Sequence, residues 1–176
     1  MKFQIDNYYE GEVGNKKLKE EFIFSYSFSP GLYDKLCKIN LFVKKDMHFI
    51  LHLFFYDMKI EKEMLKNPKE ARIEHYQVSK LPYVLRTKLS EILKANFNLK
   101  DSYLNDKNTF GNLDMTSIGS AINHSNGRFS INLSPDILDK SKFTTESEID
   151  FLKLIENIEK WLNELTESTI KLYEIE

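Results

Sequence analysis

Alternating apolar and polar positions in the first third of the chain predict neighbouring β-strands. Between residues 22 and 28 every even position is aromatic, and serines occupy two of the three odd positions. Residues 37–43 alternate in the same way, with Cys37 on the apolar face. A period of two is typical of strands that have one buried face. We therefore expect strands over 22–29 and 37–43, with Phe22 and Phe24 on the same face.

The stretch from Met47 to Tyr56 differs because both of its faces are apolar. One set of alternating positions is entirely apolar, and the other includes His48 and His52 among apolar residues. A strand of this kind is usually central and covered on both sides. We therefore predict an antiparallel β-meander from Phe22 to about Asp57, with other elements packed on each face.

Helical patterns supply candidates for these covers. Asn67-Pro-Lys-Glu70 has the form of a capping box, which predicts a helix ending near Gln77. A second helix is expected from near Ser79 to about Phe97, where apolar residues recur at helical spacing. The third should begin at the capping box Thr145-Glu-Ser-Glu148 and run to about Tyr173. Its apolar stripe is spaced by four and three residues: Phe151, Ile155, Ile158, Leu162, Leu165, Thr169 and Leu172.

The long C-terminal helix has two arrangements open to it. Its stripe can pack on the chain's own sheet, or it can form a homodimer by pairing with a second copy as a coiled coil. We favour packing on the sheet because the strand from Met47 to Tyr56 requires a cover.

Turn residues complete the predicted fold. Phe3 and Ile5 alternate with polar neighbours, which predicts a short strand over 2–9, and Asn126-Gly127 predicts a second hairpin joining 118–123 to 129–133. Residues 98–126 are polar, which indicates a loop or insertion. The chain thus predicts a single α+β domain over 1–176: an antiparallel β-meander plus a second hairpin, packed against two or three helices.

Composition limits the chemistry available to this fold. The chain has 176 residues, and its single cysteine, Cys37, excludes an intrachain disulfide and a cysteine-built zinc site. The sequence shows neither a signal-peptide pattern nor an apolar run of membrane-spanning length, so we expect a cytoplasmic protein with no membrane partner. Lysine outnumbers arginine 22 to 3, which suggests an AT-rich genome, bacterial or phage.

Metal, cofactor and nucleic-acid binding find no support in the sequence. His48 and His52 are four residues apart in a predicted strand, roughly 13 Å, which is too far for both to ligate one ion. No glycine-rich phosphate-binding motif is present, so no cofactor is expected. Arginine is scarce and lysines do not alternate with exposed aromatic residues, which argues against nucleic acid.

The charge distribution points to another protein as the partner. Residues 146–176 carry nine acidic and three basic side chains, a net charge of −6, whereas the rest of the chain is +4. With the apolar stripe facing inward, the outer face of the helix carries Glu156, Lys160, Glu164, Glu167 and Glu174. This face is either simply solvated or a binding surface for a basic protein. We add Asp114, His124 and Arg128, from the polar region, as candidate partner-binding residues.

Three functions remain open at this point. We expect a non-catalytic protein-binding module, such as an immunity-type or phage-type inhibitor that occludes a partner protein. The first alternative is a chaperone-like binder of unfolded chains or apolar ligands, which would use the aromatic residues of the meander. The second is a small enzyme that uses the 98–128 loop, where Ser117 and Ser120 could pair with His124.

Overall fold

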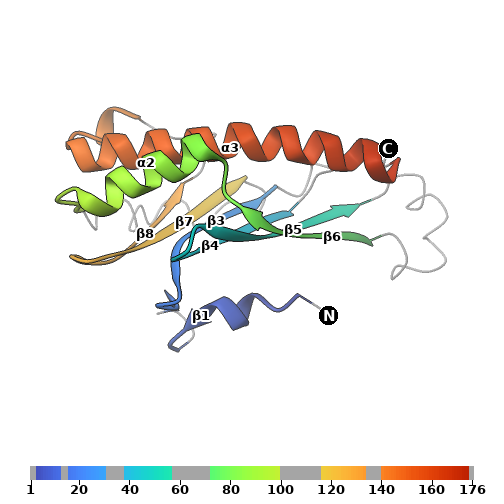
Figure 1. Ribbon diagram of the computed structural model, residues 1–176, viewed down its shortest axis with the longest axis horizontal. Helices are drawn as coiled ribbons and strands as arrows, with labels where there is room; N and C mark the ends of the chain where they lie inside the picture. The colour runs from blue at the N-terminus through green and yellow to red at the C-terminus, as the bar shows by residue number, and fades with distance from the viewer. Residues whose placement is uncertain are drawn as a thin grey trace.

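A six-stranded antiparallel sheet with helices on one face forms the main body of the protein (Figure 1). The computed structural model describes residues 3–12, 16–30, 38–56, 72–99, 116–133 and 140–174. The strand order is β6-β5-β4-β3-β7-β8. The strands are β3 (Phe22–Ser29), β4 (Lys38–Lys44), β5 (His48–Tyr56), β6 (Arg72–Lys80), β7 (Ser117–His124) and β8 (Gly127–Leu133).

Two helices, α2 (Tyr83–Lys94) and α3 (Glu146–Tyr173), lie side by side on one face of this sheet (Figure 1). The opposite face carries the N-terminal segment, which comprises the 3-10 helix η1 (Ile5–Tyr8) and a small hairpin of β1 (Tyr9–Glu10) and β2 (Lys17–Leu18). A second 3-10 turn, η5 (Lys140–Lys142), precedes α3. No helix in the described ranges has the length and hydrophobicity needed to cross a bilayer.

The predicted α+β fold is confirmed in its main parts. Strands β3, β4 and β5 form the antiparallel meander, and β7 and β8 form the second hairpin around Asn126. Gly127 has a φ of 152°, a value that favours glycine. Helix α3 begins where its capping box places it: the Thr145 side chain accepts a hydrogen bond from the amide of Glu148, whose carboxylate accepts from the amides of Thr144 and Thr145 at 2.9 Å.

The helix predicted to end near Gln77 is wrong, because Arg72–Lys80 form strand β6. This strand pairs with β5 over nine consecutive residues. The capping-box motif at 67–70 lies outside the described residues. Pairing with β5 outweighs the local helical signal over 72–77, since β propensity depends strongly on the neighbouring strand. Helix α2 consequently starts later than predicted, with Pro82 at its N-cap.

The strand predicted over residues 2–9 is also largely wrong. Most of this segment is helix η1, and only Tyr9–Glu10 pair as a strand. Its aromatic rings lie flat on the sheet: Tyr8 stacks on Phe42 with centroids 3.9 Å apart, and Phe3 stacks on His52 at 4.1 Å. Packing of these rings therefore decides the conformation of the segment.

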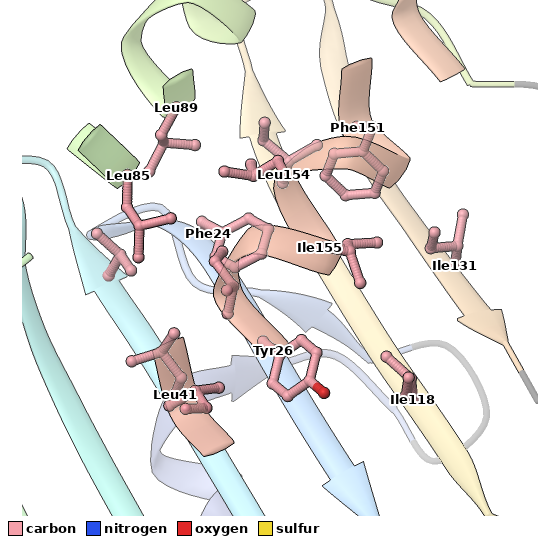
Figure 2. Packing of buried hydrophobic residues seen from close by; sticks show 14 of the residues in the cluster. Phe24, Tyr26, Leu41, Leu85, Leu89, Ile118, Ile131, Phe151, Leu154 and Ile155 are labelled. Atoms are coloured by element: carbon pink, nitrogen blue, oxygen red, sulfur yellow. The ribbon is translucent and has the colours of Figure 1, made fainter. Parts of the chain in front are cut away.

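The main core lies between the sheet and the helices. Figure 2 shows that side chains from the sheet and from both helices meet there: Phe24, Tyr26 and Leu41 from the sheet, Leu85 and Leu89 from α2, and Phe151, Leu154 and Ile155 from α3. Burying each large apolar side chain contributes about 1.5–3 kcal/mol. This helical layer is the first of the two covers that β5 was expected to have.

The second cover is the N-terminal segment rather than a helix. A smaller apolar cluster on this side contains Leu18, Phe22, Phe42 and Ala121, with Phe3, Tyr8, Tyr9 and Ile50 around it. Phe22 belongs here, not beside Phe24 as the sequence predicted. A register shift between β3 and β4 at this point, which is the effect of a β-bulge, turns Phe22 to the opposite face.

Candidate protein-binding surface

Helix α3 crosses the sheet from β3 to the edge formed by β6. Three aromatic contacts mark its course: Phe151 with Phe24 of β3, Trp161 with Phe49 of β5, and Tyr173 with His75 of β6. The Tyr173 hydroxyl also lies 3.3 Å from Nδ1 of His75. The last turns of the helix therefore lie over the edge of the sheet (Figure 1).

The five α3 residues predicted to face outward are all exposed: Glu156, Lys160, Glu164, Glu167 and Glu174. Their exposure follows from burial of the apolar stripe on the sheet. Leu172 is the exception within that stripe, because it was predicted to face inward but is 69% exposed. The helix has reached the sheet edge by this residue, so its last turn has little left to pack against.

Ion pairs involve only part of the charge on α3. In the first half, Glu156 pairs with Lys140 at 2.6 Å and Asp150 with Lys153 at 3.5 Å. In the second half, Glu164, Glu167 and Glu174 form no ion pair with any described residue. Lys160 and Lys171 also form no ion pair with a described residue, so the half of α3 that ends over the sheet edge carries three unpaired carboxylates and two unpaired ammonium groups.

One of these carboxylates, Glu174, lies where it opposes helix stability. The C-terminal end of a helix carries a partial negative charge, and an acidic side chain in the last turn costs about 0.3–1 kcal/mol relative to a favourable placement. Glu174, at the C-cap, is in this position. A solvated face explains the exposure of all three acids, and only Glu174 is placed against the helix dipole, next to Lys171 in the last turn.

Exposed apolar side chains accompany the acids. Leu172 is 69% exposed and Tyr173 is 42% exposed, on the same turn as Glu174. We call Glu164, Glu167, Leu172, Tyr173 and Glu174 the α3-end surface. Apolar groups surrounded by charge are typical of protein-interaction sites on soluble domains.

The candidates from the polar region do not join this surface. His124 is buried on the helix side of β7, where its ring lies 5.5 Å from that of Phe97 and its Nδ1 accepts a hydrogen bond from the amide of Asn126. Arg128 faces the opposite side and pairs with Glu10 and Glu20. Asp114 lies outside the described residues, as does Cys37. The ion pairs of Arg128 with Glu10 and Glu20 hold the N-terminal segment to β8.

The geometry gives no support to catalysis by the Ser117–His124 region. The Ser120 hydroxyl donates to the carbonyl oxygen of Ser25 at 2.9 Å, so it is engaged with the neighbouring strand. Of the predicted 98–126 loop, residues 117–124 are strand β7 and 100–115 lie outside the described residues.

His48 and His52 have separate surroundings, in keeping with the strand geometry. His48 lies 3.1 Å from Asp46, and buried His52 lies 3.4 Å from Glu74. Burial lowers the pKa of His52, and Glu74 opposes this shift only in part. Within the described ranges, no group of three or more His, Cys, Asp or Glu side chains could hold a metal ion.

An open groove on the face opposite the helices was not predicted from the sequence. It has a volume of about 570 Å³, and its walls include Phe3 and Ile5 of the N-terminal segment and Phe54 of β5. Asn40 and His52 also line it. Sequence reasoning missed the groove because it depends on Phe3 lying across the sheet, whereas a strand was expected there.

Comparison of the chain with protein-family models, with curated proteins and with solved structures finds no match.

Proposed function

We propose that this protein is a non-catalytic protein-binding module of the immunity or inhibitor type, which occludes a basic surface of its partner with the α3-end surface. One observation carries the proposal. Three carboxylates without ion-pair partners in the described chain, Glu164, Glu167 and Glu174, lie within the last three turns of α3, as do exposed Leu172 and Tyr173.

The two kinds of side chain have separate roles in this proposal. Clustered carboxylates attract a basic partner and raise the association rate by about 10- to 1,000-fold at low salt. Leu172 and Tyr173 supply apolar area that is buried when the complex forms. The contact of Tyr173 with His75 restrains its ring before binding, which reduces the entropy lost on association.

Affinity capture with matched charge variants tests this function. Immobilised protein in an extract of the source cells should retain one stoichiometric protein partner. Changing Glu164, Glu167 and Glu174 together to Gln should abolish capture at moderate salt. The control changes three exposed acids elsewhere, Glu12, Glu21 and Glu91, to Gln, which alters the net charge by the same amount.

The control triple variant should retain the partner. Capture of nothing, or of small molecules only, contradicts the proposed function. If both triple variants lose the partner equally, capture depends on the net charge of the protein and not on the α3-end surface.

A second function is favoured by the groove beside Phe3 and Phe54, whose volume suits an apolar ligand or an apolar side chain of an unfolded chain. A hydrophobic dye should then fluoresce with the native protein. Ile5→Glu, which places a charge on the groove wall, should reduce that signal. A native protein that leaves the dye dark argues against this second function.

A further inference from the structure

Strand β6 forms a long, regular edge of the sheet. Among the described residues it pairs only with β5, through nine consecutive residue pairs without a register shift. No proline interrupts Arg72–Lys80. An edge strand presents a row of backbone amide and carbonyl groups that can pair with another strand, and soluble proteins usually interrupt such edges with bulges or prolines. Neither device is present in β6, and its charged side chains, which can also protect an edge, are of both signs.

The outward-facing side chains of β6 include two exposed apolar residues. Tyr76 is 43% exposed and Val78 is 67% exposed, on the sheet face opposite the helices. Glu74 and Lys80 lie on the same face of the strand, one on each side of this pair. Lys80 forms no ion pair with a described residue, whereas Glu74 lies 3.4 Å from Nε2 of His52 in its own chain. The order along this face is therefore acidic, aromatic, aliphatic, basic.

We propose that β6 pairs antiparallel with β6 of a second copy of this chain, about a twofold axis through Gln77. In this register Glu74 lies opposite Lys80 of the second copy, and Tyr76 lies opposite Val78. Symmetry repeats each pairing, so the interface gains two opposite-charge pairs and two aromatic–aliphatic pairs. Cross-strand pairs of both kinds stabilise antiparallel sheets.

The register is specific because the face of each residue is fixed. A twofold axis normal to the sheet keeps the helices of both copies on the same side. Residues that pair across the junction must then lie on the same face of the sheet, and only registers that meet this condition are possible. The neighbouring registers place Glu74 opposite Val78 or Pro82 of the second copy. Each of these loses both charge pairs, so the axis through Gln77 is favoured.

This interface goes beyond the proposed function and uses a different surface. The apolar stripe of α3, from which a coiled-coil homodimer was the alternative expectation, is buried against the sheet and leaves β6 for self-association. Because α3 ends over β6, the dimer places both α3-end surfaces on one side of a twelve-stranded sheet, next to the junction. It therefore offers two acidic surfaces to a partner.

Charge reversal with restoration provides the first test, with sedimentation velocity over a range of concentrations as the measurement. Wild-type protein should sediment as a dimer. Lys80→Glu and Glu74→Lys each place like charges opposite one another twice, and each should raise the dimer dissociation constant by roughly 10- to 100-fold. The double variant E74K/K80E restores opposite charges and should recover the dimer, which also shows that the altered chains fold.

A wild-type monomer at every soluble concentration overturns the proposal. So does a dimer that Lys80→Glu leaves intact, because β6 is then not the interface. A monomer that instead binds an extended peptide of unrelated sequence along β6 shows that the edge receives another protein, and this result also overturns self-pairing.

Disulfide trapping tests the register independently. In a Cys37→Ser background, Gln77→Cys places two cysteines directly opposite at the axis, within disulfide range. Mild oxidation should link the copies covalently. Ser79→Cys is the control because residue 79 lies opposite residue 75, so its two cysteines are too far apart. Linkage through residue 79 but not 77 contradicts the register. Partner capture through the α3-end surface is measured separately, so failure of self-pairing and failure of the proposed function remain distinct.

Discussion

Removing the Phe151 side chain provides the sharpest test of how α3 packs. The ring is fully buried, and its centroid lies 6.2 Å from that of Phe24 in β3 and 5.6 Å from that of Phe97. Truncation of a buried Phe to Ala costs about 3–5 kcal/mol. For a chain of this size each kcal/mol lowers Tm by about 2–4 °C, so Phe151→Ala should lower Tm by roughly 6–20 °C.

Urea unfolding followed by far-UV circular dichroism and by tryptophan fluorescence measures this loss. Trp161 is the only tryptophan in the chain and packs edge-on against Phe49 of β5, so its emission reports directly on the contact between α3 and the sheet. Ile149→Ala is the matched control. This residue lies on the same helix but is 38% exposed, so its truncation should cost less than about 1 kcal/mol.

A loss below about 1 kcal/mol for Phe151→Ala, or a loss equal to that of the control, refutes the reasoning. The apolar stripe would then not be buried on the sheet. The coiled-coil arrangement of the same stripe would become the better account.

Three further predictions concern the cap, the buried histidine and the N-terminal segment. Glu148→Ala leaves the amides of Thr144 and Thr145 without their carboxylate acceptor and should cost about 1–3 kcal/mol in urea unfolding, whereas Glu146→Ala in the same turn should cost much less. Burial lowers the pKa of His52 below its unfolded value of about 6.5, so the unfolded chain binds a proton more readily than the folded chain. The contribution of His52 to the free energy of unfolding should therefore be complete above about pH 6.5 and should be lost as the pH drops through the folded pKa. His52→Gln should flatten the pH dependence of the free energy of unfolding between about pH 7.5 and 5. An unchanged slope would show that His52 does not cause this dependence. Arg128→Ala removes the ion pairs to Glu10 and Glu20 and should speed proteolysis within residues 3–12 while leaving the urea midpoint unchanged; equal cleavage rates would show that these pairs do not hold the segment.

Elements specified by local signals could be predicted from the sequence. The capping box at Thr145 and the four-and-three spacing locate α3, and Asn126-Gly127 locates the second hairpin. In both elements the local signal agrees with the apolar pattern that packs on the rest of the protein, so local and tertiary preferences favour the same structure.

Elements that depend on distant partners could not be predicted. Residues 72–77 carried a helical signal but pair with β5, and the N-terminal segment takes its conformation from Phe42 and His52 on the sheet. The candidate site likewise has one part that follows from the local sequence pattern and one part that depends on the rest of the fold. The exposed acids of α3 follow from its periodicity, whereas the exposure of Leu172 depends on where the helix passes the sheet edge.

The most direct test of the protein-binding proposal is the association rate with the captured partner, measured by surface plasmon resonance as a function of salt. Wild-type protein should associate faster at low salt, because the α3-end carboxylates attract the partner over a Debye length of about 10 Å at 0.1 M salt. The Gln variant at Glu164, Glu167 and Glu174 should associate slowly with little salt dependence, while the Glu12, Glu21 and Glu91 control behaves like wild type. An association rate and salt dependence that are the same in all three proteins would contradict the assignment of the α3-end surface as the binding site.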